Sequence, residues 1–353
     1  MPVSHAFRTR RLGPAVVLVA ALSWASTGAT GGPAPFRWFE PETSLSPDDL
    51  QRLGRGEVIV KPLPSKSGQL GVFATTQIAA LPDVFVEWIR NIGQLKHSPQ
   101  VPATGRFSDP PVPSDLDRLV LDRRDLEAIR ECRPTDCALK LTTAEIQAMR
   151  READGGTDAA IQEMFRRVVF ARLMVYRAGG LAAVPAPAGR STQRPTEVFA
   201  ALQASAPYIP RSDLRLSSWL DAPERSRNAG EVESYYYWSK EYYASGKPVV
   251  TLTHVGVTRA PVGSGAPEVA VAGKQFFATR YMNGMLTHLT LMRDPATGTR
   301  YMTYTNRAQL DMLRGWLGGV VRAIVNGRLR GDASAVLRTL RVRIESGPPK
   351  AGD

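Results

Sequence analysis

The chain has 353 residues, of which 43% are hydrophobic and 22% are charged, and its formal net charge is +12. This length and composition fit a globular protein with one large domain or two ordinary ones and a substantial core. The positive charge could favour nucleic acid or an anionic membrane, but no block of lysine and arginine is dense enough for a nucleic-acid-binding tail. Arginines spread over a solvated surface are the simpler interpretation, and we predict no nucleic-acid partner.

The first 29 residues have the pattern of an export signal. Three arginines precede the short apolar run Pro14–Leu22, and the small residues Ala25 and Ala29 follow where a signal peptidase could cut. The apolar run is too short to span a bilayer, which needs about 20 residues. We therefore expect a signal peptide over residues 1–29 and a soluble bacterial protein that is periplasmic or secreted.

The compartment decides how the only two cysteines, Cys132 and Cys137, are interpreted. An oxidising space favours a disulfide between them, closing a short loop that contains Pro134 and Asp136. A redox pair is more often spaced as Cys-x-x-Cys, and a metal site needs further ligands nearby. We predict a structural disulfide and no metal site.

The N-terminal part of the mature chain alternates between strand and helix patterns. Residues 30–45 are rich in Gly and Pro and are predicted to be a linker. Ser46 is a suitable N-cap for a short helix, and Val84, Phe85, Trp88 and Ile89 share one helical face. The further elements predicted here are strands over 56–62, 70–79 and 101–107 and helices over 82–89 and 92–96.

The middle of the chain, at about residues 108–232, is predicted to be a helical insertion within one domain. Helical periodicity is strongest over 158–178, which ends at Gly179-Gly180, and Thr142 is a suitable cap for another helix. Residues 182–194 are rich in Pro, Ala and Gly. The other elements predicted here are a short strand over 138–141 and helices over 143–152, 195–202 and 213–220.

The last hundred residues return to strands and then change to helical spacing. Alternating patterns predict strands over 249–257, 268–282, 285–292 and 300–306, following a tyrosine-rich strand at Tyr235–Trp238. Apolar residues at helical spacing then predict one long helix over about 308–345. Residues 346–353 are predicted to be a disordered tail.

The order of these elements resembles the START-like, helix-grip (SRPBCC) superfamily. The resemblance rests on residues 56–107, with their Val-Phe-x-x-Trp-Ile helix, and on residues 235–345, whose long helix has glycines near its start. It implies an α+β fold in which a curved antiparallel sheet grips the C-terminal helix, spanning residues 46–345 with the insertion. Lipid-transfer domains, aromatic polyketide cyclases and pollen allergens share that fold. Tyr237–Glu241 and Thr251–Val255 also resemble uncharacterised exported bacterial proteins.

Common catalytic and cofactor signatures are missing from the sequence. It contains no Gly-x-Ser-x-Gly, no His-Glu-x-x-His, no phosphate-binding Gly-x-x-x-x-Gly-Lys and no Gly-x-Gly-x-x-Gly. Apart from His5, only His97, His254 and His288 are present, and their spacing supports no metal site. We predict no cofactor and lean away from an enzyme.

Five residues are the candidate ligand contacts: His254, Lys274, Tyr281, Tyr304 and Trp238. Each is polar or aromatic and interrupts, or belongs to, an otherwise apolar strand, where a buried polar group needs a partner. Lys274, which alternation places with apolar neighbours, is the best candidate for holding an anionic head group. A hydrogen-bonded core histidine, a lysine reaching the rim and tightly packed aromatics are the structural alternatives.

The resemblance, together with a cavity-forming pattern that has no catalytic signature, implies an exported protein that sequesters or carries a hydrophobic small molecule or lipid in an internal cavity. One alternative is a cyclase- or hydrolase-type enzyme on the same fold, in which His254, Tyr281 or Lys274 places protons. Another is a non-catalytic envelope interaction protein with a solid core. Arginines on the final helix could also make peripheral contact with an anionic membrane.

Overall fold

The protein is described from a computed structural model covering residues 35–188, 193–222, 231–243, 246–261, 263–313 and 318–349. The side chains of residues 318–330 and 332 are outside this description. The predicted signal peptide, residues 1–29, also lies outside the described residues. Among the described residues, no helix combines the length and apolar character needed to cross a membrane.

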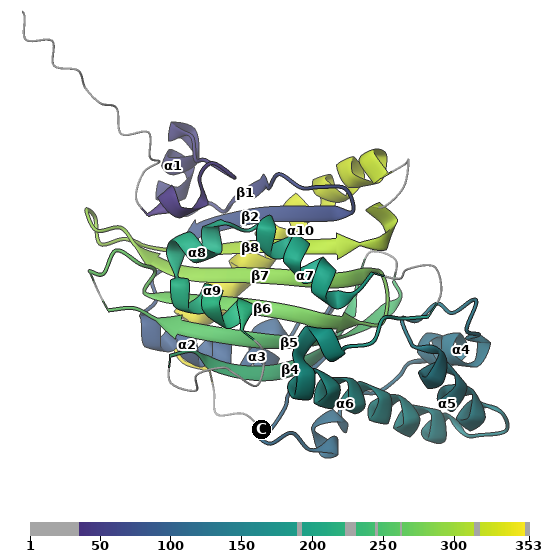
Figure 1. The fold of residues 1–353 in the computed structure, drawn as a ribbon. Helices are drawn as coiled ribbons and strands as arrows, with labels where there is room; N and C mark the ends of the chain where they lie inside the picture. The colour runs from purple at the N-terminus through teal and green to yellow at the C-terminus, as the bar shows by residue number, and fades with distance from the viewer. Residues whose placement is uncertain are drawn as a thin grey trace, which may run out of the picture. The chain divides into compact units, whose positions relative to one another are not determined.

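The fold is α+β and is built on one curved, eight-stranded antiparallel sheet (Figure 1). Its strand order is β1-β2-β8-β7-β6-β5-β4-β3, so most neighbours in the C-terminal half are also consecutive in the chain. The strands are β1 (Ile59–Pro62), β2 (Gln69–Gln77), β3 (Ala103–Arg106), β4 (Glu233–Tyr242), β5 (Pro248–Arg259), β6 (Val269–Ala278), β7 (Met282–Arg293) and β8 (Arg300–Leu310). Successive side chains of a strand point to opposite faces, so every strand contributes to two different surfaces.

Helices of the middle segment cover one face of the sheet, which we call the insertion face. In Figure 1, α7, α8 and α9 lie in front of the strands, whereas α4 and α5 lie beside the sheet, and α7 and α9 pack directly on β5 to β8. Their apolar sides are buried with Leu252, Phe276 and Leu286 in a single core. The helices are α4 (Arg123–Glu131), α5 (Thr143–Ala153), α6 (Asp158–Ala183), α7 (Pro195–Ala204), α8 (Tyr208–Ser212) and α9 (Leu214–Asp221).

The opposite face, which we call the α10 face, is contacted by α2 (Pro82–Arg90), α3 (Ile92–Lys96) and α10 (Gly318–Glu345). Leu337 and Ile344 of α10 are buried with Phe85 and Trp88 of α2 against the apolar end of this face. The final helix starts at Gly318 rather than near residue 308. β8 continues to Leu310, because residues up to there still pair with β2 and β7, and a short 3-10 helix follows at Asp311–Leu313.

The structure corrects the prediction that residues 30–45 are a linker. Its described part forms a 3-10 helix, Phe36–Phe39, and both phenylalanines are buried in the core beneath the insertion face. Burying each of these aromatic side chains stabilises the fold by about 2 kcal/mol or more, so the segment is ordered despite its Gly and Pro residues. Of the expected tail, residues 346–349 are described, and the Gly347 carbonyl accepts a hydrogen bond from Trp88 Nε1 at 2.7 Å.

Among the other local predictions, some are confirmed by the structure and one is wrong. Ser46 and Thr142 cap α1 (Pro47–Gly54) and α5 with reciprocal hydrogen bonds, as predicted. The segment labelled α6 is two helices joined at Gly180, whose non-helical φ of 65° ends the first helix where Gly179-Gly180 predicts. No strand forms at residues 138–141, where Lys140 N instead bonds the Thr279 carbonyl. The predicted disulfide between Cys132 and Cys137 is present.

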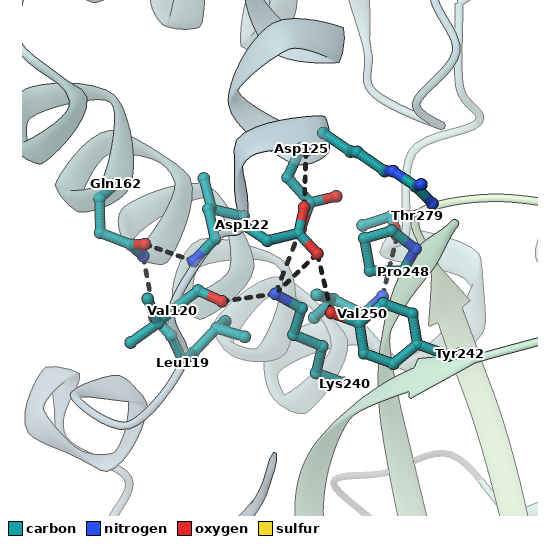
Figure 2. A network of polar contacts seen from close by, with 12 residues as sticks. Leu119, Val120, Asp122, Asp125, Gln162, Lys240, Tyr242, Pro248, Val250 and Thr279 are labelled. Carbon is teal, nitrogen blue, oxygen red and sulfur yellow. Dashed lines mark hydrogen bonds and ion pairs between the residues drawn. The ribbon is translucent and has the colours of Figure 1, made fainter. Parts of the chain in front are cut away.

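A buried cluster of charges attaches α4 to the sheet (Figure 2). Lys240 Nζ of β4 lies 3.6 Å from Asp122 and 3.5 Å from Asp125, and it donates to the Val120 carbonyl at 2.8 Å. Arg280 donates to Asp125 at 3.1 Å from the other side. Burial raises the Asp125 pKa, and the lysine and arginine charges oppose that shift without cancelling it. Two cations and two carboxylates therefore balance in charge at this junction, although Asp125 Oδ2 and Arg280 Nε have no hydrogen-bond partner.

The attachment of α9 to β5 can be tested at Gly256. A Cβ atom there would lie 2.8 Å from the Trp219 ring, which is closer than packing tolerates. We expect Gly256→Ala to lower the free energy of unfolding in urea by roughly 2 kcal/mol through overpacking. Gly273→Ala is the matched control, because a Cβ there would meet its nearest neighbour at 3.5 Å. Equal losses in the two variants would contradict this account of the packing.

Candidate functional site

Solvent reaches the middle of the sheet on the α10 face but not on the insertion face. On the adjacent strands β7 and β8, Met285, Thr287, Tyr304 and Asn306 are half-buried, whereas the residues between them point to the insertion face and are buried. A row of polar side chains, which we call the polar belt, crosses the α10 face at this level. The belt consists of Lys96 from α3, Tyr237, Ser239 and Glu241 from β4, Thr251 and Thr253 from β5, Gln275 from β6, Thr287 from β7, and Tyr304 and Asn306 from β8.

The charged centre of the polar belt is the ion pair between Lys96 and Glu241, at 2.6 Å. Ser239 and Tyr243 donate further hydrogen bonds to the same carboxylate at 2.6 and 2.7 Å. Burial by itself raises the Glu241 pKa, but the lysine charge and these donors outweigh it and hold the pKa below its usual value. Burial likewise lowers the Lys96 pKa, and Glu241 more than restores it, so the Lys96 pKa lies above its usual value. Both groups are ionised at neutral pH.

The two ends of the polar belt approach each other because the sheet is curved. β4 and β8 are separated by three strands, which in a flat sheet would place them about 19 Å apart. Nevertheless, the charges of Lys96 and Glu241 act on the Tyr304 hydroxyl of β8, whose pKa is raised mainly by burial. Asn306 Nδ2 donates to that hydroxyl at 2.8 Å. The α10 face is therefore the concave face.

Two polar atoms in the polar belt are left without a hydrogen bond. Thr253 Oγ1 and Gln275 Oε1 belong to paired residues on neighbouring strands, and both atoms are buried. Neither has a hydrogen-bond partner in the structure. A buried polar atom without a partner costs about 1–3 kcal/mol, so each one in a structure calls for a physical reason.

The predicted ligand contacts are divided among three places. Tyr304 lies in the polar belt. Three others lie on the insertion face: His254 Nδ1 is 3.2 Å from the Tyr176 hydroxyl, Lys274 Nζ donates to the Leu220 carbonyl at 2.9 Å, and Trp238 Nε1 donates to the Asp115 carbonyl at 2.9 Å. His254 and Lys274 are paired across β5 and β6 and are covered by Trp219 of α9. Tyr281 lies in the bend between β6 and β7.

Sequence reasoning missed the pairing of Lys96 with Glu241. The two residues are 145 positions apart and come from a short helix and a strand, so no local spacing reveals their contact. One signal was present in the sequence. Glu241 and Ser239 alternate in phase with Tyr237, which places a carboxylate on the same face as an aromatic ring.

His288 is a second unusual group, on the insertion face. Its ring lies between Phe39 and Tyr208, with centroids 6.5 and 5.9 Å away, and neither ring nitrogen has a hydrogen-bond partner in the structure. Burial lowers the His288 pKa to about 4, although the Asp213 charge acts weakly in the opposite direction. The imidazole is therefore neutral at pH 7.

Metal chemistry has no candidate centre in the described part of the chain, where no three His, Cys, Asp or Glu side chains are grouped to hold an ion.

Comparisons with known proteins add little. No family model and no curated protein matches the chain. One solved structure, the di-domain ARO/CYC BexL from the BE-7585A biosynthetic pathway, aligns over 86% of this chain and 92% of that chain. The sequence identity is 11% and the TM-score is 0.22, a likeness too low to carry any argument about function.

The ion pair of the polar belt can be tested by a double-mutant cycle. Lys96→Met leaves the Glu241 carboxylate buried without its cation, and we expect the free energy of unfolding to fall by about 3 kcal/mol. Adding Glu241→Gln should recover most of that loss. Arg123→Met, in the exposed pair with Glu127, is the control and should cost less than about 0.5 kcal/mol. Additive losses in the double variant would rule out the coupling.

Burial of neutral His288 predicts a specific loss of stability in acid. Because its folded pKa is about 4 and an unfolded histidine titrates near 6.5, the unfolded state binds more protons between these values. Stability is therefore full above pH 6.5 and falls by about 3 kcal/mol as pH drops to 4. We expect His288→Leu to remove this component of the pH dependence, measured by urea unfolding at each pH. Met292→Leu, on the same strand and face, should keep it.

Proposed function

We propose that the protein binds a small organic molecule on the concave α10 face of its sheet, in the manner of a helix-grip protein. The observation that carries this proposal is the polar belt, where solvent reaches polar side chains in the middle of the sheet and where Thr253 and Gln275 each keep a buried atom unpartnered. Ligand sites are concave and mostly apolar, with a few polar groups that fix orientation. A bound molecule would supply the missing hydrogen-bond partners.

The composition of the polar belt indicates the chemistry of the ligand. The atoms of the polar belt that can still form hydrogen bonds belong to a hydroxyl and an amide group, while its one carboxylate is already neutralised by Lys96. The neighbouring side chains are the aromatic rings of Tyr237 and Tyr304 and the sulfur of Met285. This surface suits a neutral aromatic compound with several hydroxyl or carbonyl groups better than a plain acyl chain.

Binding is favoured over acid–base catalysis by the direction of the pKa shifts. Glu241 is shifted down, and Lys96, Tyr243 and Tyr304 are shifted up, so each keeps its ordinary charge state at neutral pH. A general acid or base works best with a pKa near the operating pH. A carrier or sequestering role outside the cytoplasm remains part of the proposal and depends on the predicted export signal.

A matched pair of probes tests this proposal. We expect 2,6-dihydroxynaphthalene to bind the mature protein at least about tenfold more tightly than naphthalene, because a site built for hydrogen bonds rejects an analogue that lacks them. Gln275→Leu should abolish most of that preference without unfolding the protein. Gln77→Leu, on β2 outside the polar belt, is the control. Dissociation constants from ligand fluorescence give the comparison.

Equal affinity for the two probes would show that the polar belt does not recognise polar groups. Failure of both probes to bind at their solubility limits would remove the proposal of a ligand site for compounds of this class.

A further inference from the structure

A surface cleft of about 740 Å³ lies beside the disulfide loop. One wall is formed by Pro134–Lys140, which includes Cys137, and the other by Arg280, Tyr281 and Asp311, with Pro187 and Ala188 completing it. Its volume is in the range of small-molecule sites, which hold roughly 300–1,000 Å³. No proposed ligand contact other than Tyr281 lines this cleft.

The walls of the cleft are held in place by several independent contacts. The disulfide closes the loop, Lys140 makes an ion pair with Asp311 at 2.5 Å, and Asn283 donates to the same carboxylate at 2.8 Å. Arg280 is buried and donates to Asp125 and to the Pro248 carbonyl. The cleft is therefore a preformed feature rather than a gap between loosely packed side chains.

Tyr281, which lines the cleft, has an unusual backbone conformation. Its φ is 63°, the only positive value at a non-glycine residue in the described chain. Met282 N donates to the Arg280 carbonyl at 2.7 Å, so the chain reverses over three residues in a γ-turn centred on Tyr281. A bulky residue in this region costs of order 1–3 kcal/mol, and such strain concentrates at functional sites.

The Tyr281 side chain also belongs to a small apolar cluster on the concave face. It packs with Met285 and Leu310 against buried Val249, Ala278 and Met282. This cluster adjoins the polar belt directly, because Asn306 Nδ2 lies 3.0 Å from Met285 Sδ and Gln275 Nε2 lies 3.8 Å from Met282 Sδ. Tyr281 lines the cleft and also packs with these methionines, so its ring lies where the cleft meets the cluster that adjoins the polar belt.

We propose that the cleft is the outer compartment of the ligand site, through which a small aromatic ligand reaches the polar belt, and that the Tyr281 ring controls passage. This inference rests on the proposed function. The methionine side chains are flexible and polarizable, so they can yield to a passing aromatic ring. The γ-turn fixes the backbone of Tyr281, so passage requires movement of its side chain rather than of the strands.

Association and dissociation rates of 2,6-dihydroxynaphthalene, measured by stopped-flow fluorescence on the mature protein, test the inference. Tyr281→Gly removes the ring, and glycine adopts the positive φ without strain. We expect both rates to rise at least about tenfold, with the dissociation constant changed by less than about threefold, because a gate alters the barrier and not the bound state. Ala188→Trp, which fills the cleft, should slow association by about tenfold. Tyr301→Phe, at the far end of β8, is the control.

The outcomes separate the two proposals. If the wild-type protein binds the probe but both rates are unchanged in Tyr281→Gly and Ala188→Trp, access through the cleft is wrong and the ligand site stands. A dissociation constant that rises tenfold or more in Tyr281→Gly through faster dissociation alone would also overturn the gate, since the ring would then be a ligand contact. If the wild-type protein does not bind the probe, the proposed function fails and the inference falls with it.

Discussion

The structure depends on the alternation of side chains in a sheet that has helices on both of its faces. Every polar residue within a strand must find its hydrogen bonds on one particular face, because the backbone groups of the strand are already used by the ladder. On the insertion face, the helices supply partners from their own ends and side chains. The Leu220 carbonyl meets Lys274, and the Tyr176 hydroxyl meets His254. Among the described side chains on that face and at the α4 junction, the buried atoms left without a hydrogen-bond partner include both His288 ring nitrogens, Asp125 Oδ2 and Arg280 Nε.

The concave face is organised differently. Its apolar end is filled by α2 and the second half of α10, and its other end by the cluster around Met282. Between these ends lies the polar belt, whose only charged pair is internally neutral and whose amide and hydroxyl groups are incompletely paired. The large core beneath the insertion face stabilises the sheet from one side, so the other side can retain polar groups at a cost of a few kcal/mol.

Much of the fold was predictable because period-2 and period-3.6 patterns are local properties of the sequence. The strands of the C-terminal half, the α2 helix and the caps at Ser46 and Thr142 follow from such patterns. The site was less predictable, because alternation breaks at a bulge. Lys274 and Ala278 should share a face by strict alternation, but the pairing of β5 with β6 shifts between Leu252 and Thr253. Lys274 lies on the insertion face with Ala272 and Phe276, as alternation predicts, whereas Ala278 lies on the concave face.

Lys274, the strongest single candidate from the sequence, and the polar belt lie on opposite faces for a different reason. Spacing shows which residues share a face within an unbroken run, and it cannot say which layer will cover that face. A lysine in an apolar strand suggests an anion site, but in this fold the Leu220 carbonyl at the end of α9 is the hydrogen-bond acceptor for Lys274. Nothing in the sequence distinguishes an amide such as Gln275 as a ligand contact. In the structure, its oxygen on the concave face has no hydrogen-bond partner although the neighbouring strands are in place, and this makes it a more specific sign of ligand binding than the lysine.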